Sequence, residues 1–183
     1  RHTFGKMKLE VMDSNGKLVT ELDAKKQKGI NIVEWSYRGK APKVATGKTF
    51  SFDAFGTPIV AAGDYKIVLT KGKKVYENPI KVINDPKSPI SAADRKAQQK
   101  LVKEVFDMTE ELAYMVYKVD EMITYSESAI KKNTSLAKKG NIAKKELNAF
   151  KKTLVITTGD NYVGQAEKQL REKIADVYGA VVN

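Results

Sequence analysis

Apolar and polar residues alternate in short runs through the first part of the chain and then recur every three to four residues to its end. The change falls at residues 84–89, where two prolines among small polar residues favour neither helix nor strand. A period of two is typical of half-buried strands, and a spacing of three to four is typical of amphipathic helices. The pattern predicts an all-β domain at residues 1–86 followed by an all-α domain at residues 87–183.

Short strands separated by turns are predicted in the first block. Met7–Val11 alternates and is followed by Asn15-Gly16, the strongest two-residue hairpin signal, while the loop around Gly72 closes a second hairpin. Trp35, the only tryptophan, is expected in a core between two sheets, and Pro79 marks an edge or bulged strand. About six or seven such strands are typical of a β-sandwich. Those predicted cover residues 7–11, 17–22, 30–35, 50–52, 65–69 and 75–82.

One long helix is predicted to open the second block. Ser91 is a candidate N-cap, Asp94 favours the first turn, and helical spacing continues to about Lys132. At about 1.5 Å per residue such a helix is on the order of 60 Å long. Alternating steps of four and three predict a heptad seam of Leu101, Val105, Met108, Leu112, Met115, Val119 and Met122. The three methionines are interpreted as core residues, with a partner-binding methionine face as the alternative.

Two further helices follow. The second is predicted to begin at an Asn141 cap and run to about Leu154, and the third runs from about Val163 to Val181. Short polar loops between three helices favour an up-down-up bundle. Further apolar residues, Ile123 and Ile130 among them, widen the stripe on the first helix, which leaves room for a fourth helix.

Composition narrows the possible chemistry. The chain has no cysteine, which excludes disulfides, zinc–thiolate sites and a cysteine nucleophile. His2 is the only histidine, so a Ser-His-Asp triad and a multi-histidine metal site are excluded as well. No cofactor, metal or catalytic residue is predicted, and no apolar run reaches the roughly 20 residues that span a bilayer. The chain opens without a methionine or a signal core and is interpreted as a piece of a longer protein.

The net charge of +11 comes almost entirely from lysine, since only four of the 33 basic residues are arginine. Specific recognition of phosphates and bases relies on arginine forks and interleaved aromatic residues. The lysines here are scattered through turns and polar helix faces. Nucleic acid is therefore not the predicted partner, and a solvated lysine-rich surface is the simpler interpretation.

The first predicted helix and the loop that follows it carry a candidate interaction surface. It comprises Tyr114, Tyr117, Tyr125, Lys131, Lys132, Lys138 and Lys139. Exposed tyrosines can contact a sugar or a peptide, although tyrosines at the flank of a bundle commonly keep only the hydroxyl in water. The lysines can form an anion-binding face or simply solvate the loop and the second helix.

Carboxylates on the first helix raise the alternative that the chain is itself a hydrolase. They are Glu104, Asp107, Glu110, Glu111, Asp120 and Glu121. Glycoside hydrolysis needs two carboxylates that face each other across the scissile bond. Carboxylates along one helix are far more often its solvated face, so this alternative is not favoured.

The order of motifs in the strand block resembles a known module. Gly29, Asn31 and Trp35 match a Gly-x-Asn-x-x-x-Trp strand, and Gly63 with Tyr65 match a later small-Gly-x-Tyr strand. The pattern resembles the immunoglobulin-like module of flagellar hook-capping proteins and of many bacterial exported proteins. This resemblance implies an immunoglobulin-like β-sandwich and carries no chemistry.

The two blocks together resemble a narrower class. Residues 79–86, the helix start at residues 91–99 and the late helix at residues 169–181 look like the C-terminal region of bacterial sortilin-like proteins with BNR-repeat β-propellers, common in Bacteroidetes. The resemblance implies an exported parent whose propeller lies upstream of Arg1 and is often glycosyl-hydrolase-like. Catalytic residues would belong to that propeller, so none is assigned to this chain.

The sequence therefore predicts a non-catalytic accessory region of an exported protein, located in the periplasm, at the outer-membrane surface or outside the cell. An immunoglobulin-like sandwich would act as spacer, and a three-helix or incomplete four-helix bundle would dock on the upstream domain or on another envelope protein. The alternative is a carbohydrate-binding module of a sialidase-like glycoside hydrolase, whose lysines would meet acidic glycans.

Overall fold

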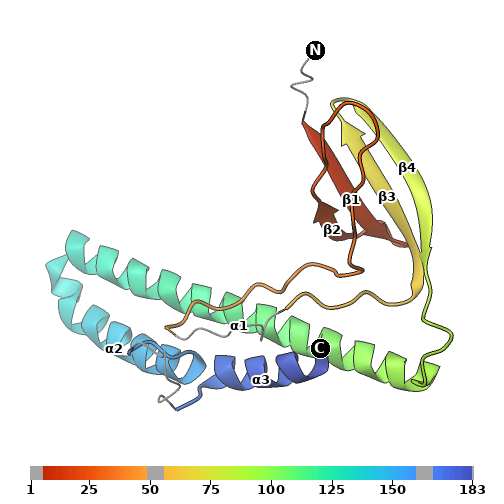
Figure 1. Ribbon diagram of the computed structural model, residues 1–183. Coiled ribbons are helices and arrows are strands. Elements are labelled where there is room, and N and C mark those ends of the chain that lie inside the picture. Colours follow the sequence, from red (N-terminus) through yellow and green to blue (C-terminus); the bar gives the residue numbers. More distant parts are fainter. Residues whose placement is uncertain (1–5, 49–55, 160–166, 183) are drawn as a thin grey trace. The chain divides into compact units, whose positions relative to one another are not determined.

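The computed structural model describes residues 6–48, 56–159 and 167–182 (Figure 1). Of these, the residues up to 40 and those from 57 to 95 form one compact unit, and the residues from 41 to 56 and from 96 onward form the other. The chain therefore enters the second unit, returns to the first and crosses again early in the long helix. A division at residue 86 assigns residues 41–48 to the β domain, whereas Lys43 and Lys48 donate backbone hydrogen bonds to the helical unit.

A four-stranded antiparallel sheet in the order β2-β1-β3-β4 forms the first unit. Its strands are β1 (Met7–Asp13), β2 (Leu18–Leu22), β3 (Gly63–Lys71) and β4 (Lys74–Val82). Both predicted hairpins are confirmed. The Asp13 carboxylate accepts hydrogen bonds from the backbone N–H of Asn15 and Lys17, and Gly16 takes the left-handed φ of 76° that this turn requires.

The edge position of β4 agrees with its proline. Pro79 has no N–H to donate to a further strand, and β4 has only β3 as a neighbour in the described sheet. Along β3, Tyr65, Ile67 and Leu69 share the face on which Val11 of β1 is fully buried. The sheet is thus a single layer, and the face that carries Val11 is partly buried.

The predicted strand at residues 30–35 is wrong. This segment is irregular, Ile30 is 92% exposed, and the Asn31 side chain closes a local turn on Gln27 and Gly29. A strand needs a partner, and in the described residues this segment has none. Trp35 accordingly lies in a loop, half-buried, rather than between two sheets. Its indole N–H donates to the Arg38 carbonyl, and its ring meets the edge of Tyr65 at 5.8 Å. The predicted strand at residues 50–52 lies outside the described residues.

Three α-helices and one 3₁₀ turn follow the sheet. They are α1 (Ala92–Lys132), η1 (Thr134–Leu136), α2 (Ala137–Leu154) and α3 (Leu170–Val182). The predicted start of α1 is confirmed, since the Ser91 hydroxyl accepts from the Asp94 N–H and donates to its carboxylate. Asn141 is not a cap, because Asn133 caps η1 through its side chain and that turn leads directly into α2. The predicted residues Val163 and Ala166 lie outside the described ones.

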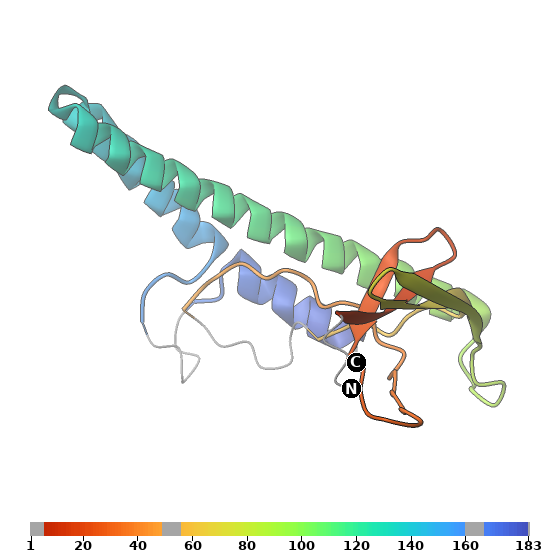
Figure 2. The same ribbon diagram turned by 90° about the horizontal axis from the view of Figure 1, so that it is seen from above.

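The two shorter helices lie one after the other along α1 (Figures 1 and 2). α2 pairs with the half of α1 that ends at Lys132, and the C-terminal end of α3 reaches its beginning, where Gln98 donates to the Val181 carbonyl. α3 therefore runs in the same direction as α2 rather than reversing as the up-down-up order predicts. The reason is geometric: a helix of 18 residues covers only about 27 Å of α1, and α3 shields the remainder.

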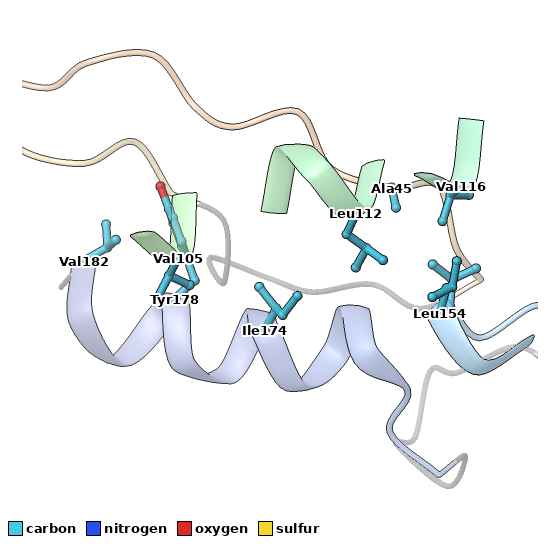
Figure 3. Packing of buried hydrophobic residues seen from close by; sticks show 9 residues of the cluster. Ala45, Val105, Leu112, Val116, Leu154, Ile174, Tyr178 and Val182 are labelled. Carbon is cyan, nitrogen blue, oxygen red and sulfur yellow. The ribbon is translucent and has the colours of Figure 1, made fainter. Parts of the chain in front are cut away.

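A single apolar cluster holds the helical unit together (Figure 3). Its buried members are Ala45, Val105, Leu112, Val116, Leu154, Val155, Ile174, Tyr178 and Val182. They come from α1, α3, the end of α2 and the segment at residues 41–48. Tyr178 is fully buried, and its hydroxyl donates to the Gly56 carbonyl at 2.9 Å. A segment from inside the strand block thus completes the helical core.

The buried line on α1 differs from the predicted heptad seam. Its buried residues are Val105, Thr109, Leu112, Val116 and Val119. Met115 packs against the core, but Met108 is 50% exposed and Met122 is 54% exposed, so their interpretation as core residues is wrong. The three methionines lie on one flank of the buried line, at successive steps of seven residues, and only Met115 meets the core there. Ile123 and Ile130, predicted as a flank, lie closer to that face and are half-buried.

Burial of Tyr178 predicts a loss of stability at high pH. Burial raises its pKa from 10.0 to about 12, because the phenolate is the form that loses hydration. Since the folded-state pKa lies above the unfolded value, this stabilisation is fully present below pH 10.0 and is lost as the pH rises toward 12. We expect urea unfolding between pH 9 and 12 to show a steeper fall for the native chain than for Tyr178→Phe. Parallel curves for the two chains would contradict this expectation.

Candidate functional site

A groove lies between α1 and α2. Its volume is about 710 Å³, and it is lined by Glu121, Met122, Tyr125 and Ser126 of α1 and by Ala143, Glu146, Leu147 and Phe150 of α2. The two helices run antiparallel here, so each supplies one wall. Within the described residues no third helix lines this stretch, because α3 packs beside the first half of α1.

The opposite edge of the α1–α2 pair is closed by ion pairs. Lys144 lies 2.7 Å from Glu127, and Lys151 lies 2.5 Å from Asp120. The hydrogen bond from Lys144 lowers the pKa of Glu127, with its positive charge adding to the effect. Because residues 144 and 151 share one side of α2, the groove residues 143, 147 and 150 lie on the flank next to that side.

Gly140 permits the close approach of the two helices near their connection. A Cβ atom at this position would lie 2.7 Å from Cδ1 of Ile130, well inside van der Waals contact. α2 can therefore start against α1 and diverge from it along the groove. The absence of a side chain at Gly140 thus lets the lysine-rich α2 approach α1 closely at this point.

Large apolar side chains in the groove remain exposed. Met122 is 54% exposed, Tyr125 76% and Phe150 50%. Carboxylates of Glu121 and Glu146 stand on the two walls, and Glu146 is the single acidic residue of α2. Glu121 pairs with Lys118 at 2.7 Å, whereas Glu146 has no ion pair within the part of the chain that the structure describes. The groove is thus an apolar strip with acidic rims on a basic protein.

The predicted interaction surface is split into separate places. Tyr114 and Tyr117 are 61% and 60% exposed and lie on either side of Lys118, whose ammonium is 5.6 Å and 5.8 Å from their ring centroids. The hydrogen bond to Glu121 raises the pKa of Lys118, and this group stays charged. Tyr125 belongs to the groove instead.

The four predicted lysines gather at the connection between α1 and α2. Lys131 and Lys132 end α1, Lys138 and Lys139 lie in the first turn of α2, and all four are exposed. Tyr114 is about 25 Å from Lys131 along the helix, so tyrosines and lysines do not form one face. Because cations in the last turn of α1 face the negative end of its dipole, a solvated helix end explains Lys131 and Lys132.

The acidic residues of α1 do not form a facing pair. Glu104 and Asp107 pair with lysines one turn away, and Glu110 accepts the Lys43 N–H at 3.2 Å. Among the described residues, no group of three or more acidic or histidine side chains is arranged to hold a metal ion. These carboxylates act as a solvated face and as contacts to neighbouring segments.

The sequence did not predict the groove. Met122 was expected in the core, and Ile142, Leu147, Phe150 and Leu154 were noted only as the apolar residues of the second helix. The spacing of Ile142, Leu147 and Phe150 gave a signal, since steps of five and three place them on diverging faces of a helix. Which of them would be covered depends on the ion pairs across to α1.

No family model, curated protein or solved structure matches this chain. Within the described residues, none of the helices has the length and apolar character needed to cross a membrane. The resemblance to sortilin-like and hook-capping proteins therefore stays a prediction.

Proposed function

We propose that this chain is a non-catalytic docking region of a larger exported cell-envelope protein. The observation that carries the proposal is the open apolar groove between α1 and α2, where Met122, Tyr125 and Phe150 are at least half exposed. Contiguous exposed apolar side chains rimmed by polar groups are typical of surfaces that bind another protein. Export and the upstream β-propeller rest on the family resemblance described above.

The incomplete covering of both units supports a role inside a larger assembly. Among the described residues, loop residues such as Trp35 lie against the apolar face of the sheet, as expected of one layer of an immunoglobulin-like sandwich. The helices likewise leave the groove between α1 and α2 open. We propose that the sheet belongs to an immunoglobulin-like sandwich and that a further helix in the groove gives a four-helix arrangement.

The size and location of the native polypeptide test the proposal. We expect an antibody against this chain to detect, in the envelope or secreted fraction, a species several times heavier than 20.4 kDa. Mass spectrometry of that band should return peptides from both this region and a β-propeller. A species of about this mass in the cytosol would contradict the proposal, since the chain would then be neither part of a larger protein nor exported.

A carbohydrate-binding module is the second candidate, and one feature favours it. Next to the groove, Tyr117 and Tyr125 line a hollow of about 460 Å³ together with Asp120, Thr124 and Ser128. Aromatic rings beside hydroxyl and carboxylate groups are suited to stack on and hydrogen-bond a sugar. The two carboxylates of the hollow, those of Asp120 and Glu121, favour a neutral sugar over an acidic one.

Calorimetry distinguishes the second candidate from the first. Neutral, sialylated and sulfated oligosaccharides would be titrated at millimolar concentration into the native chain and into Tyr117→Ala. Heat that the substitution abolishes would support sugar binding in the hollow. Absence of heat with every sugar would reject this candidate and leave protein docking.

A further inference from the structure

We propose that the groove between α1 and α2 binds an amphipathic helix from a partner, and that basic residues on this helix pair with Glu121 and Glu146. The proposal rests on the docking function and specifies its site and the chemistry of its partner. The proposed partner segment is a helix because of the spacing of the residues on the two groove walls.

The groove walls have the spacing that a third helix recognises. Residues 121, 122, 125 and 126 form a two-turn ridge on α1, and residues 143, 146, 147 and 150 form a matching ridge on α2. Ridges at steps of three and four are the surfaces between which another helix inserts its own ridge. Helices that bind such grooves place apolar anchors at positions i, i+3 or i+4, and i+7. Phe150 and Met122 would receive these anchors.

Charge selects a basic partner helix over an acidic one. The groove has an acidic residue on each wall, and the lysines of α2 that lie nearest to α1 are already paired with Asp120 and Glu127. Glu146 is the acidic residue of α2, it is exposed, and it has no ion-pair partner in the described residues. A lysine or arginine beside the apolar anchors would pair with it, whereas a glutamate would be repelled.

A second copy of this chain is a poorer occupant. The helix that would have to enter the groove would be a lysine-rich α2 or an acidic stretch of α1, and both already use one face in the α1–α2 contact. The partner helix is therefore supplied from outside this chain.

Two matched peptides test the proposal on the whole 183-residue chain. The basic peptide has about 14 residues, leucine at i, i+3 or i+4 and i+7, lysine beside the leucines and alanine elsewhere. The acidic peptide replaces each lysine by glutamate. We expect fluorescence polarisation to show the basic peptide binding about ten-fold more tightly than the acidic one. Glu146→Lys should reverse this preference, and Glu104→Lys, the same change outside the groove, should not.

Substitutions in the apolar walls locate the binding. Phe150→Asp on α2 and Tyr125→Asp on α1 should each weaken the basic peptide at least ten-fold. Ile142→Asp is the matched control, because Ile142 is 52% exposed on α2 but does not line the groove. Circular dichroism would verify that each variant is folded. The two groove variants lie on different helices, so that if one variant does not fold the other still tests the proposal.

Three results would overturn the inference. They are no binding of the basic peptide, equal binding of both peptides, and a dimer seen by sedimentation that Phe150→Asp dissociates. If one of these results is obtained and the native protein is still a heavy envelope species, the groove assignment fails and the proposed function stands. If it is instead a small cytosolic protein, the proposed function fails whatever the peptides do.

Discussion

Tyr178→Ala is expected to destabilise the helical unit by about 3–5 kcal/mol, the range for removing a large aromatic side chain from a core. Tyr178 is fully buried in the cluster that joins α1 and α3, and its hydroxyl holds the Gly56 carbonyl at 2.9 Å. The substitution removes the ring contacts and leaves that carbonyl without this donor. Urea unfolding followed by helical circular dichroism would measure the loss.

Two variants separate the contributions in this prediction. Tyr178→Phe keeps the ring and removes only the hydrogen bond, so it should cost about 1–2 kcal/mol. Tyr114→Ala, at a tyrosine that is 61% exposed on α1, should stay within about 0.5 kcal/mol of the native chain. Should Tyr178→Ala unfold at the same urea concentration as Tyr114→Ala, α3 would not be packed on α1 as described.

Features set by neighbouring residues could be predicted from the sequence. The Asn15-Gly16 hairpin and the Ser91–Asp94 cap are examples, because each depends on a few consecutive side chains and their own backbone. The length of α1 was predictable for the same reason. Pro79 indicated an edge strand, since the missing N–H is a property of that residue alone.

Features that depend on distant partners could not be predicted. Residues 30–35 alternate like a strand, yet no described strand lies beside them to form a ladder. Ala45 lies in a polar loop by sequence, but a small apolar side chain there fits the core of the helical unit. The groove escaped prediction because Lys144 and Lys151 orient α2 through acidic residues that lie far away in the sequence.

The strongest electrostatic contact in the helical core is between neighbours on α3. Arg171 and Glu172 are 8% and 7% exposed, and Nη1 of Arg171 lies 3.2 Å from Oε1 of Glu172. The other oxygen of Glu172 accepts the backbone N–H of Gln169, which satisfies a donor at the start of the helix. Gly47 leaves space for the guanidinium, since a Cβ there would lie 2.7 Å from Nη1. The Arg171 guanidinium therefore lies against Gly47, in the segment at residues 41–48.

Removing either partner of this pair should destabilise the helical unit by about 3–5 kcal/mol, because the other charge stays buried and loses this contact. Arg171→Met and Glu172→Leu would each show this loss in urea unfolding. The double variant should be more stable than either single variant, since the burial of charge disappears together with the attraction. Asp176→Asn is the control on the same helix: its pair with Lys168 is exposed, at 2.7 Å, and should contribute less than about 1 kcal/mol. Additive losses in the double variant would mean that the two side chains contribute independently, and this would contradict a coupled ion pair.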